Sequence, residues 1–261
     1  MEYSQDYIEK QVIELKKLQN KLIGDNNTKQ DIFKTNEFAE KLMEITRNTY
    51  NKIGKKYAEV RTFELSEFDK KVWNKLLSYI NQYISEDYKK LKLLDVGTGH
   101  GRDLKYALNL GFDAIGVDNS DLFINVLERL ASNNIIPSNS FTKADMRKLP
   151  FKNDSFDVVR HQATLLHSPI VAKGYTVDKA IEESYRVLKK NGLLYVLVKK
   201  GKDIQYIDTN EGLGGRIFQF YNENTISNLI ERNGFKVIDI TNEEENRKGN
   251  LVEWIMVIAQ K

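Results

Sequence analysis

The chain has 261 residues, with 40 basic and 37 acidic side chains, a net charge of +3 and no cysteine. This length accommodates one α/β domain with a sizeable core plus an extension. The small net charge gives no argument for a nucleic-acid partner, and the lack of cysteine excludes disulfides, thiolate nucleophiles and zinc ribbons.

The start MEYSQDYIEK is polar and acidic, so it has no secretory signal. No apolar stretch approaches the roughly 20 residues needed to cross a bilayer. We therefore expect a cytoplasmic protein, and the abundance of Lys, Asn and Ile suggests a bacterial source.

The first 45 residues are predicted to form a helical extension. Ile8, Val12, Leu15 and Leu22 recur at helical spacing and form one apolar seam along a charged helix, which Asp25–Asn27 end. One helix cannot bury this seam alone. We expect it to dock on its own domain, as a lid; a homodimer contact through the same helix is the alternative. The predicted division is an extension or lid at 1–45 and a main domain at 46–261.

A helix is expected over residues 68–80, just before the segment LLDVGTGHGR, residues 93–102. Residues 93–96 suit a buried strand, and the glycines after it leave a turn that a ligand can approach closely. A helix follows and ends at Gly111, and residues 114–117 form a second strand. Asp118 follows about 20 residues after the first glycine, where a carboxylate accepts hydrogen bonds from both hydroxyls of a ribose.

Further alternation predicts the rest of the sheet. Strands are expected near 141–144, at 156–159 and over the run LLYVLV, the last preceded by a helix over 177–188. Such alternation gives a parallel sheet with helices on both faces. The segments FKVIDIT (235–241) and VEWIMVIAQ (252–260) are joined by a polar loop too short for a crossover helix, so they are expected to pair antiparallel.

Five motifs occur together, and the chain resembles a class I S-adenosylmethionine-dependent methyltransferase of the small-molecule, bacterial type. The motifs are LLDVGTGHGRD, GVDNS, KADMRKLPF, NDSFDVV and RVLKKNGLLYV. The resemblance implies a Rossmann-like, doubly wound α/β fold. Its seven-stranded sheet is mostly parallel with a C-terminal antiparallel strand, and the N-terminal helices are an addition to it. Residues 46–261 would then be the S-adenosylmethionine-binding domain.

The resemblance also implies a cofactor site. The glycine motif and its acid would hold the methionine part, Asp118 the ribose, and Asp145 with the Met146 amide the adenine. The sequence Thr49–Tyr57 is similar to a pattern ahead of the first strand in this family, whose tyrosines would close over the sulfonium. The cofactor-binding residues expected on this basis are Asp95, Gly97, Thr98, Gly99, Asp118, Asn119, Asp145, Met146, His161, Gln162, Tyr50 and Tyr57. No metal is expected.

The chemistry expected is in-line methyl transfer, in which the protein aligns donor and acceptor and excludes water. If the acceptor carries a proton, a histidine suits its removal near neutral pH. His161 and His167 are the catalytic candidates, since His100 lies inside the glycine turn. His161 is equally suited to hold the methionine carboxylate, and His167 to a structural role. Beyond the fifth strand, Arg216, Phe218 and Tyr221 are the substrate candidates, after a GLGG segment that permits a gate.

Three functions follow, in order. The first is methyl transfer from S-adenosylmethionine, with S-adenosylhomocysteine as product, to the O, N or C atom of a small molecule. The second is RNA methylation, which has no appended RNA-binding module to support it but several scattered lysines: Lys52, Lys55, Lys56, Lys89, Lys90, Lys189, Lys190, Lys199 and Lys200. The third is a Rossmann-type NAD-binding oxidoreductase or a non-catalytic nucleoside binder.

Overall fold

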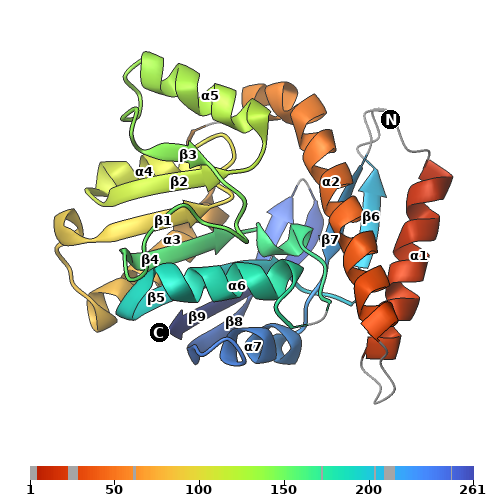
Figure 1. Cartoon of the computed structure of the whole chain (residues 1–261). Helices are drawn as coiled ribbons and strands as arrows, with labels where there is room; N and C mark the ends of the chain where they lie inside the picture. Colours follow the sequence, from red (N-terminus) through yellow and green to blue (C-terminus); the bar gives the residue numbers. More distant parts are fainter. Residues whose placement is uncertain are drawn as a thin grey trace.

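A seven-stranded sheet with the order β3-β2-β1-β4-β5-β9-β8 forms the centre of the molecule (Figure 1). The computed structural model describes residues 5–22, 29–60, 63–171, 173–202, 204–208, 215–247 and 249–261. The strands of the sheet are β1 (Lys92–Val96), β2 (Asp113–Asp118), β3 (Phe141–Lys143), β4 (Phe156–Gln162), β5 (Leu188–Lys199), β8 (Lys236–Arg247) and β9 (Asn250–Gln260). Strands β1 to β5 pair in parallel, and β9 is antiparallel to both neighbours. The predicted fold is confirmed.

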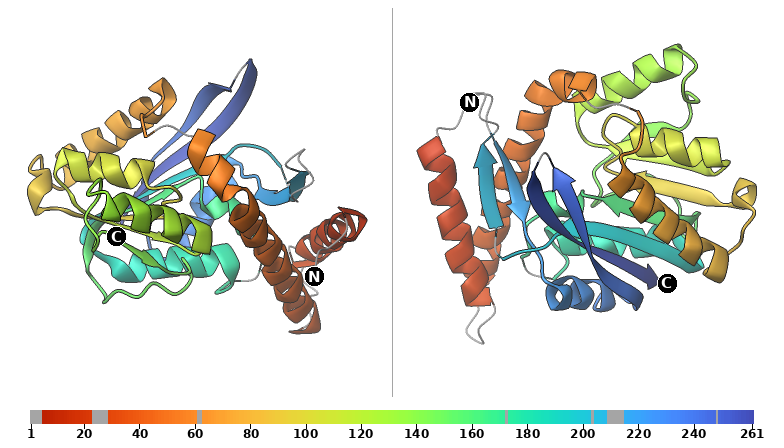
Figure 2. Two further views of the ribbon diagram at one scale, coloured as in Figure 1. Left: turned by 90° about the horizontal axis from the view of Figure 1, so that it is seen from above. Right: turned by 180° about the vertical axis from the view of Figure 1, so that it is seen from behind.

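Helices cover both faces of this sheet. They are α3 (Glu67–Tyr83), α4 (Arg102–Leu110), α5 (Asp121–Ser132), α6 (Thr176–Val187) and α7 (Glu223–Glu231), with short 3₁₀ turns at Tyr88–Lys90 and Leu165–His167. Helix α6 lies in front of the sheet in Figure 1 and α3 behind it, and the reverse view in Figure 2 agrees. Leu93, Leu94, Val158 and Val159 are fully buried, as expected for central strands covered on both faces.

The C-terminal hairpin is longer than the sequence predicted. Strands β8 and β9 pair from Lys236↔Gln260 as far as Arg247↔Asn250, so the segment expected to be a polar loop is mostly strand. Polar residues alternate along its outer half, and such a pattern also suits a hairpin that is solvated on one face. The extra length carries the hairpin past the end of the sheet (Figure 2).

The N-terminal helix docks on its own chain, as predicted. Helix α1 (Gln5–Leu22) packs against α2 (Lys29–Val60) and the strand β6 (Ile204–Asp208), which pairs with β7 (Gly215–Gln219) in a separate two-stranded sheet (Figure 1). Ile8, Val12 and Leu15 of the predicted seam are buried in an apolar cluster there, whereas the side chain of Leu22 lies outside the described residues.

Helix α2 connects this N-terminal unit to the main sheet. Thr49 Oγ1 donates a hydrogen bond of 2.7 Å to the Gly215 carbonyl, and the Ile217 amide donates one of 2.9 Å to Thr46 Oγ1. The helix runs without a break through the expected boundary at residue 45. The GLGG segment proposed as a gate lies outside the described residues except for Gly215.

Candidate functional site

The glycine turn between β1 and α4 is held against β2. The amides of Gly97 and Thr98 both donate to the Val117 carbonyl, over 2.8 and 3.0 Å. Gly97 has a φ of +73°, and a Cβ there would lie 2.4 Å from Thr164 Oγ1. Packing alone therefore requires glycine at this position. At Gly99 a Cβ would meet no atom within 4 Å, so this part of the turn leaves space for a ligand.

Asp118, at the end of β2, faces the same turn. One carboxylate oxygen accepts from the Gly99 amide and the other from the Ser120 amide, each over 2.9 Å. These bonds hold the carboxylate in one orientation, and each oxygen keeps a further lone pair. Burial raises the pKa of Asp118 to about 6, although the backbone donors oppose the rise.

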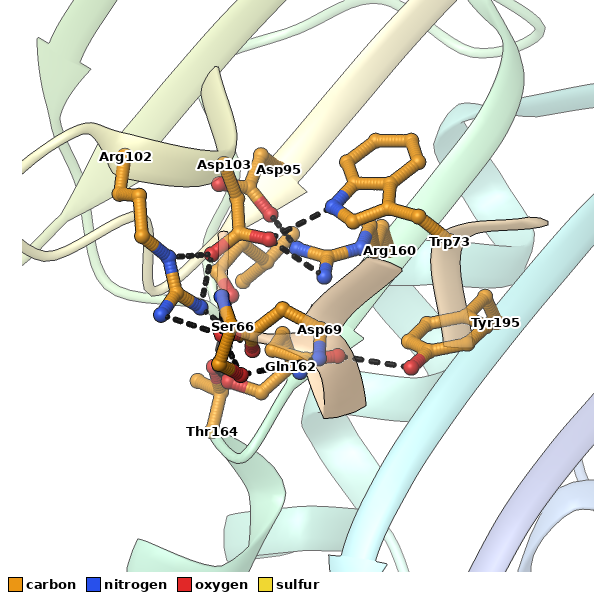
Figure 3. Close-up of polar contacts among 11 residues, drawn as sticks. Ser66, Asp69, Trp73, Asp95, Arg102, Asp103, Arg160, Gln162, Thr164 and Tyr195 are labelled. Carbon is orange, nitrogen blue, oxygen red and sulfur yellow. Dashed lines mark hydrogen bonds and ion pairs between the residues drawn. The ribbon is translucent and has the colours of Figure 1, made fainter. Parts of the chain in front are cut away.

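A network of buried charges lies beneath the turn (Figure 3). Arg160 of β4 donates to Asp95 of β1 over 3.0 Å and to Asp103 of α4 over 2.8 Å. Arg102 pairs with Asp69 of α3 through two bonds of 2.7 and 2.8 Å, and also reaches Asp103. The Arg160 guanidinium carbon lies 4.5 Å from the Trp73 ring centroid, and Trp73 Nε1 donates to Asp103 over 2.7 Å.

This network carries an excess of negative charge, because three carboxylates meet two guanidinium groups. Burial raises the pKa of Asp95, with Arg160 opposing it. Burial would also raise the pKa of Asp103, but Arg160 and Arg102 lower it to about 2. Asp95 Oδ2 is buried and has no hydrogen-bond partner within the described part of the chain. A cationic group of a ligand is the natural partner for such an oxygen.

A pocket of about 340 Å³ extends from the glycine turn to α2, β7 and the C-terminal hairpin. Its volume suits a small-molecule site. It brings together most of the residues singled out in the sequence: Asp95, Gly97, Thr98, Gly99, Asp118, Asn119, Met146, Gln162, Tyr50, His167, Arg216 and Phe218.

His161 and Tyr221 do not line this pocket, and both interpretations are corrected. Side chains alternate along β4, so Arg160 faces α3 while His161 faces α6. His161 Nε2 lies 2.8 Å from Ser184 Oγ, whose own proton goes to the Ala180 carbonyl, so the imidazole is the donor. Burial lowers the pKa of His161 to about 3. Tyr221 is fully buried, and its hydroxyl donates to the Leu165 carbonyl.

Asp145 also differs from expectation. Its carboxylate pairs with Arg147, whose Nη2 lies 2.7 Å away, and it borders a separate depression beside α2 rather than the main pocket. Burial would raise the pKa of Asp145, but Arg147 lowers it. Met146, the next residue, does line the pocket. Tyr57 lies in α2, but its side chain is outside the described residues.

Tyr50 and His167 form a hydrogen-bonded pair at the far end of the pocket, where Tyr50 Oη lies 2.9 Å from His167 Nε2. His167 Nδ1 lies 2.8 Å from the Ile217 carbonyl, which only accepts, so the ring proton is on Nδ1 and Nε2 accepts from Tyr50. Arg216 donates to Tyr50 Oη over 3.3 Å. Burial, with Arg216 and Lys199 nearby, lowers the pKa of His167 to about 3, so this imidazole is neutral.

Several lining residues escaped the sequence-based prediction. Lys199 ends β5, Arg247 and Trp254 come from the unexpectedly long hairpin, and Met43 and Arg47 come from α2. The only sequence signal was the lysine cluster around Gly201, which was interpreted as a solvated loop. The hairpin residues carried no signal, because their segment was predicted to be a loop.

Comparison with known proteins identifies the domain. A family model described as a methyltransferase domain matches residues 94–196. The chain is 26% identical over 188 residues to a ubiquinone/menaquinone biosynthesis C-methyltransferase of Rhizobium rhizogenes, covering 70% of this chain and 66% of that protein. It is 30% identical over 129 residues to a ubiquinone biosynthesis O-methyltransferase of Pelagibacter ubique, covering 46% and 50%. The chain thus spans less than two thirds of either relative.

Solved structures show the same fold. A S-adenosylmethionine-dependent methyltransferase from Methanosarcina mazei superposes with a TM-score of 0.56 at 23% identity, covering 70% of this chain and 96% of that one. The matched family segment runs from β1 to β5 and contains the glycine turn, Asp118 and the β4 end. The chain therefore belongs to the class I S-adenosylmethionine-dependent methyltransferases.

Proposed function

We propose that this protein transfers the methyl group of S-adenosylmethionine to a small molecule. The observation that carries this proposal is one continuous pocket, with Asp118 and the glycine turn at one end and Tyr50, Arg216 and Phe218 at the other. The first end has the features of a nucleoside site, and the second is lined by elements that lie outside the matched family segment.

The residues at the first end fit the cofactor. Asp118 presents a carboxylate, already oriented by two backbone amides, to which ribose hydroxyls can donate. Asp95 Oδ2, buried and without a partner among the described residues, would accept from the methionine ammonium group. The excess negative charge of the network beneath the turn favours that cation. Asn119 and Met146 would border the adenine.

The bound cofactor supplies a methyl group made electrophilic by a sulfonium. Tyr50 lies on α2 at the other end of the pocket, where its phenol, fixed between Arg216 and His167, would orient the acceptor. His167 holds this phenol by accepting its proton in a hydrogen bond, so we propose a positioning role for His167. Helix α2 and β7 would exclude water from this end of the pocket.

Two measurements test this function. In calorimetry, we expect binding of S-adenosylhomocysteine and no binding of NADH. With methyl-labelled S-adenosylmethionine and a cell extract, we expect label in the small-molecule fraction. Label in tRNA or rRNA instead would establish the RNA alternative, and binding of NADH alone would contradict both methyltransferase hypotheses.

The affinity for S-adenosylhomocysteine is expected to fall as the pH falls through about 6. Because burial raises the pKa of Asp118 to about 6, the carboxyl group is ionised above this pH and protonated below it. Only the ionised form accepts from both ribose hydroxyls, so well below pH 6 the Kd rises about ten-fold per pH unit. Titrations between pH 5 and 8 measure this. Asp118→Asn should have a much weaker pH dependence, and an equal slope in both proteins would assign the effect to another group.

Asp145→Ala is expected to weaken cofactor binding by less than about ten-fold, or about 1 kcal/mol. The carboxylate pairs with Arg147 and borders a different depression, so its loss should leave the preference for adenine over hypoxanthine unchanged. Titration with S-adenosylhomocysteine and its inosine analogue measures both. A lost preference would show that Asp145 turns away from Arg147 and contacts the base.

We further propose a cytoplasmic, bacterial protein, on the composition of the chain. No described helix combines the length and apolar character that a bilayer span requires. The division at residue 45 into an extension and a main domain also stays a proposal, as does a homodimer through α1. Such a dimer would use another face of α1, because its apolar seam is buried within the chain.

A further inference from the structure

Two cations at the acceptor end of the pocket have no carboxylate partner among the described residues. Lys199 ends β5 and Arg216 lies on β7, and both are half-buried and line the pocket. Lys199 Nζ lies 4.2 Å from the centroid of the Phe218 ring, and the Arg216 guanidinium carbon lies 5.4 Å from it. Arg216 Nε is buried without a hydrogen-bond partner, while Nη1 donates to Tyr50 Oη.

The neighbouring groups do not neutralise these cations. Glu245 of the C-terminal hairpin is the nearby carboxylate, and Arg247 holds it in an ion pair of 2.8 Å. Trp254 Nε1 donates to the same carboxylate over 2.9 Å. His167 is neutral. Burial, together with Arg247 and Arg216, lowers the pKa of Lys199 to about 8, with Glu245 opposing.

The buried charge network provides a contrast within the same pocket. Arg160 and Arg102 are both paired with carboxylates, as the cost of burying a charge demands. Lys199 and Arg216 bear the same cost without such compensation. Unpaired charges of one sign, gathered in a pocket at the end of a parallel sheet, indicate a ligand of the opposite sign.

We propose that the methyl acceptor is a small anion with an aromatic or apolar body, whose carboxylate or phosphate group binds between Lys199 and Arg216. This inference rests on the proposed function and names its substrate class. The guanidinium offers a planar fork and the ammonium a point charge to the oxyanion. The rings of Phe218, Tyr50 and Trp254 border the space beside them and would contact the body.

Binding of this anion would also change the Tyr50–His167 pair. Both cations lower the proton affinity of His167, and an anion between them offsets that effect. The acceptor would thereby make His167 Nε2 a better recipient for a proton passed through Tyr50, which lies at hydrogen-bond distance from it.

The test uses the full chain, with and without saturating S-adenosylhomocysteine. Phenylacetate and phenyl phosphate are titrated against the neutral phenylacetamide and the cationic phenethylamine. We expect at least one of the two anions to bind about ten-fold or more tightly than the amide or the amine. Lys199→Met and Arg216→Met should each remove most of this preference while the affinity for S-adenosylhomocysteine is unchanged.

Lys200→Met is the matched control. This neighbouring lysine pairs with Glu223 over 2.9 Å and does not line the pocket, so the preference should persist. The inference is overturned if the amide binds as tightly as both anions, if no probe binds, or if the preference survives both substitutions. Failure of S-adenosylhomocysteine to bind contradicts the proposed cofactor instead, and the titrations without it still decide whether the anion site exists.

Discussion

Replacing Arg160 with methionine is expected to lower the free energy of unfolding by about 3–5 kcal/mol. The guanidinium is 1% exposed and is bonded to both Asp95 and Asp103. Methionine fills a similar volume but leaves two buried carboxylates facing each other without their shared counterion. The guanidinium also packs on the rings of Trp73 and Tyr195, so lysine should restore only part of the loss.

Urea denaturation of the purified proteins measures this effect through the transition midpoint. Lys189→Met removes a cation that is 39% exposed and bonded to Asp157, so it should cost no more than about 1 kcal/mol. If the two substitutions had equal effects, the buried network would not have the energetic role assigned to it. A double variant, Arg160→Met with Asp103→Asn, should recover part of the stability by removing one of the two unpaired charges.

Asp118→Ala is expected to weaken binding of S-adenosylhomocysteine by about 3 kcal/mol, on the order of 100-fold in Kd. Two hydrogen bonds from ribose hydroxyls to a charged acceptor would be lost together. The substitution also removes the acceptor for the Gly99 and Ser120 amides, which hold the turn. Asp118→Asn retains one acceptor oxygen, so an intermediate loss is expected.

The matched control is Asp113→Ala, at the opposite end of the same strand. That carboxylate is 59% exposed and lies 3.5 Å from Lys92, far along β2 from the pocket. Its loss should leave the affinity unchanged, and thermal unfolding of all three variants separates folding defects from binding defects. An Asp118→Ala protein that is folded and binds with undiminished affinity would refute the ribose assignment.

The cofactor half of the pocket was predictable because local sequence determines it. A buried strand, a glycine turn and an acid at the next strand end are all specified within residues 93–118, and parallel pairing of β1 with β2 brings Asp118 to the turn. Hydrophobic periodicity likewise predicted the order of strands and the docking of α1. The seven strands and their antiparallel end followed from the same patterns.

The acceptor half was less predictable because it is assembled from distant segments. Tyr50 and His167 are 117 positions apart, and their contact depends on how α2 crosses β7. Lys199 appeared to belong to an exposed lysine cluster, and only the extension of the β8–β9 hairpin shows that it lines a pocket. The hairpin length depended on cross-strand pairing, which a polar sequence does not reveal by itself.

The sequence by itself determined the fold, the glycine turn and the position of Asp118, since these depend on periodicity and on contacts within one βαβ unit. Only the tertiary structure decided the direction in which the β4 side chains point. Alternation requires Arg160 and His161 to face opposite sides, but which side bears the pocket depends on the packing of α3 and α6. That packing buries Arg160 among carboxylates and removes His161 from the site.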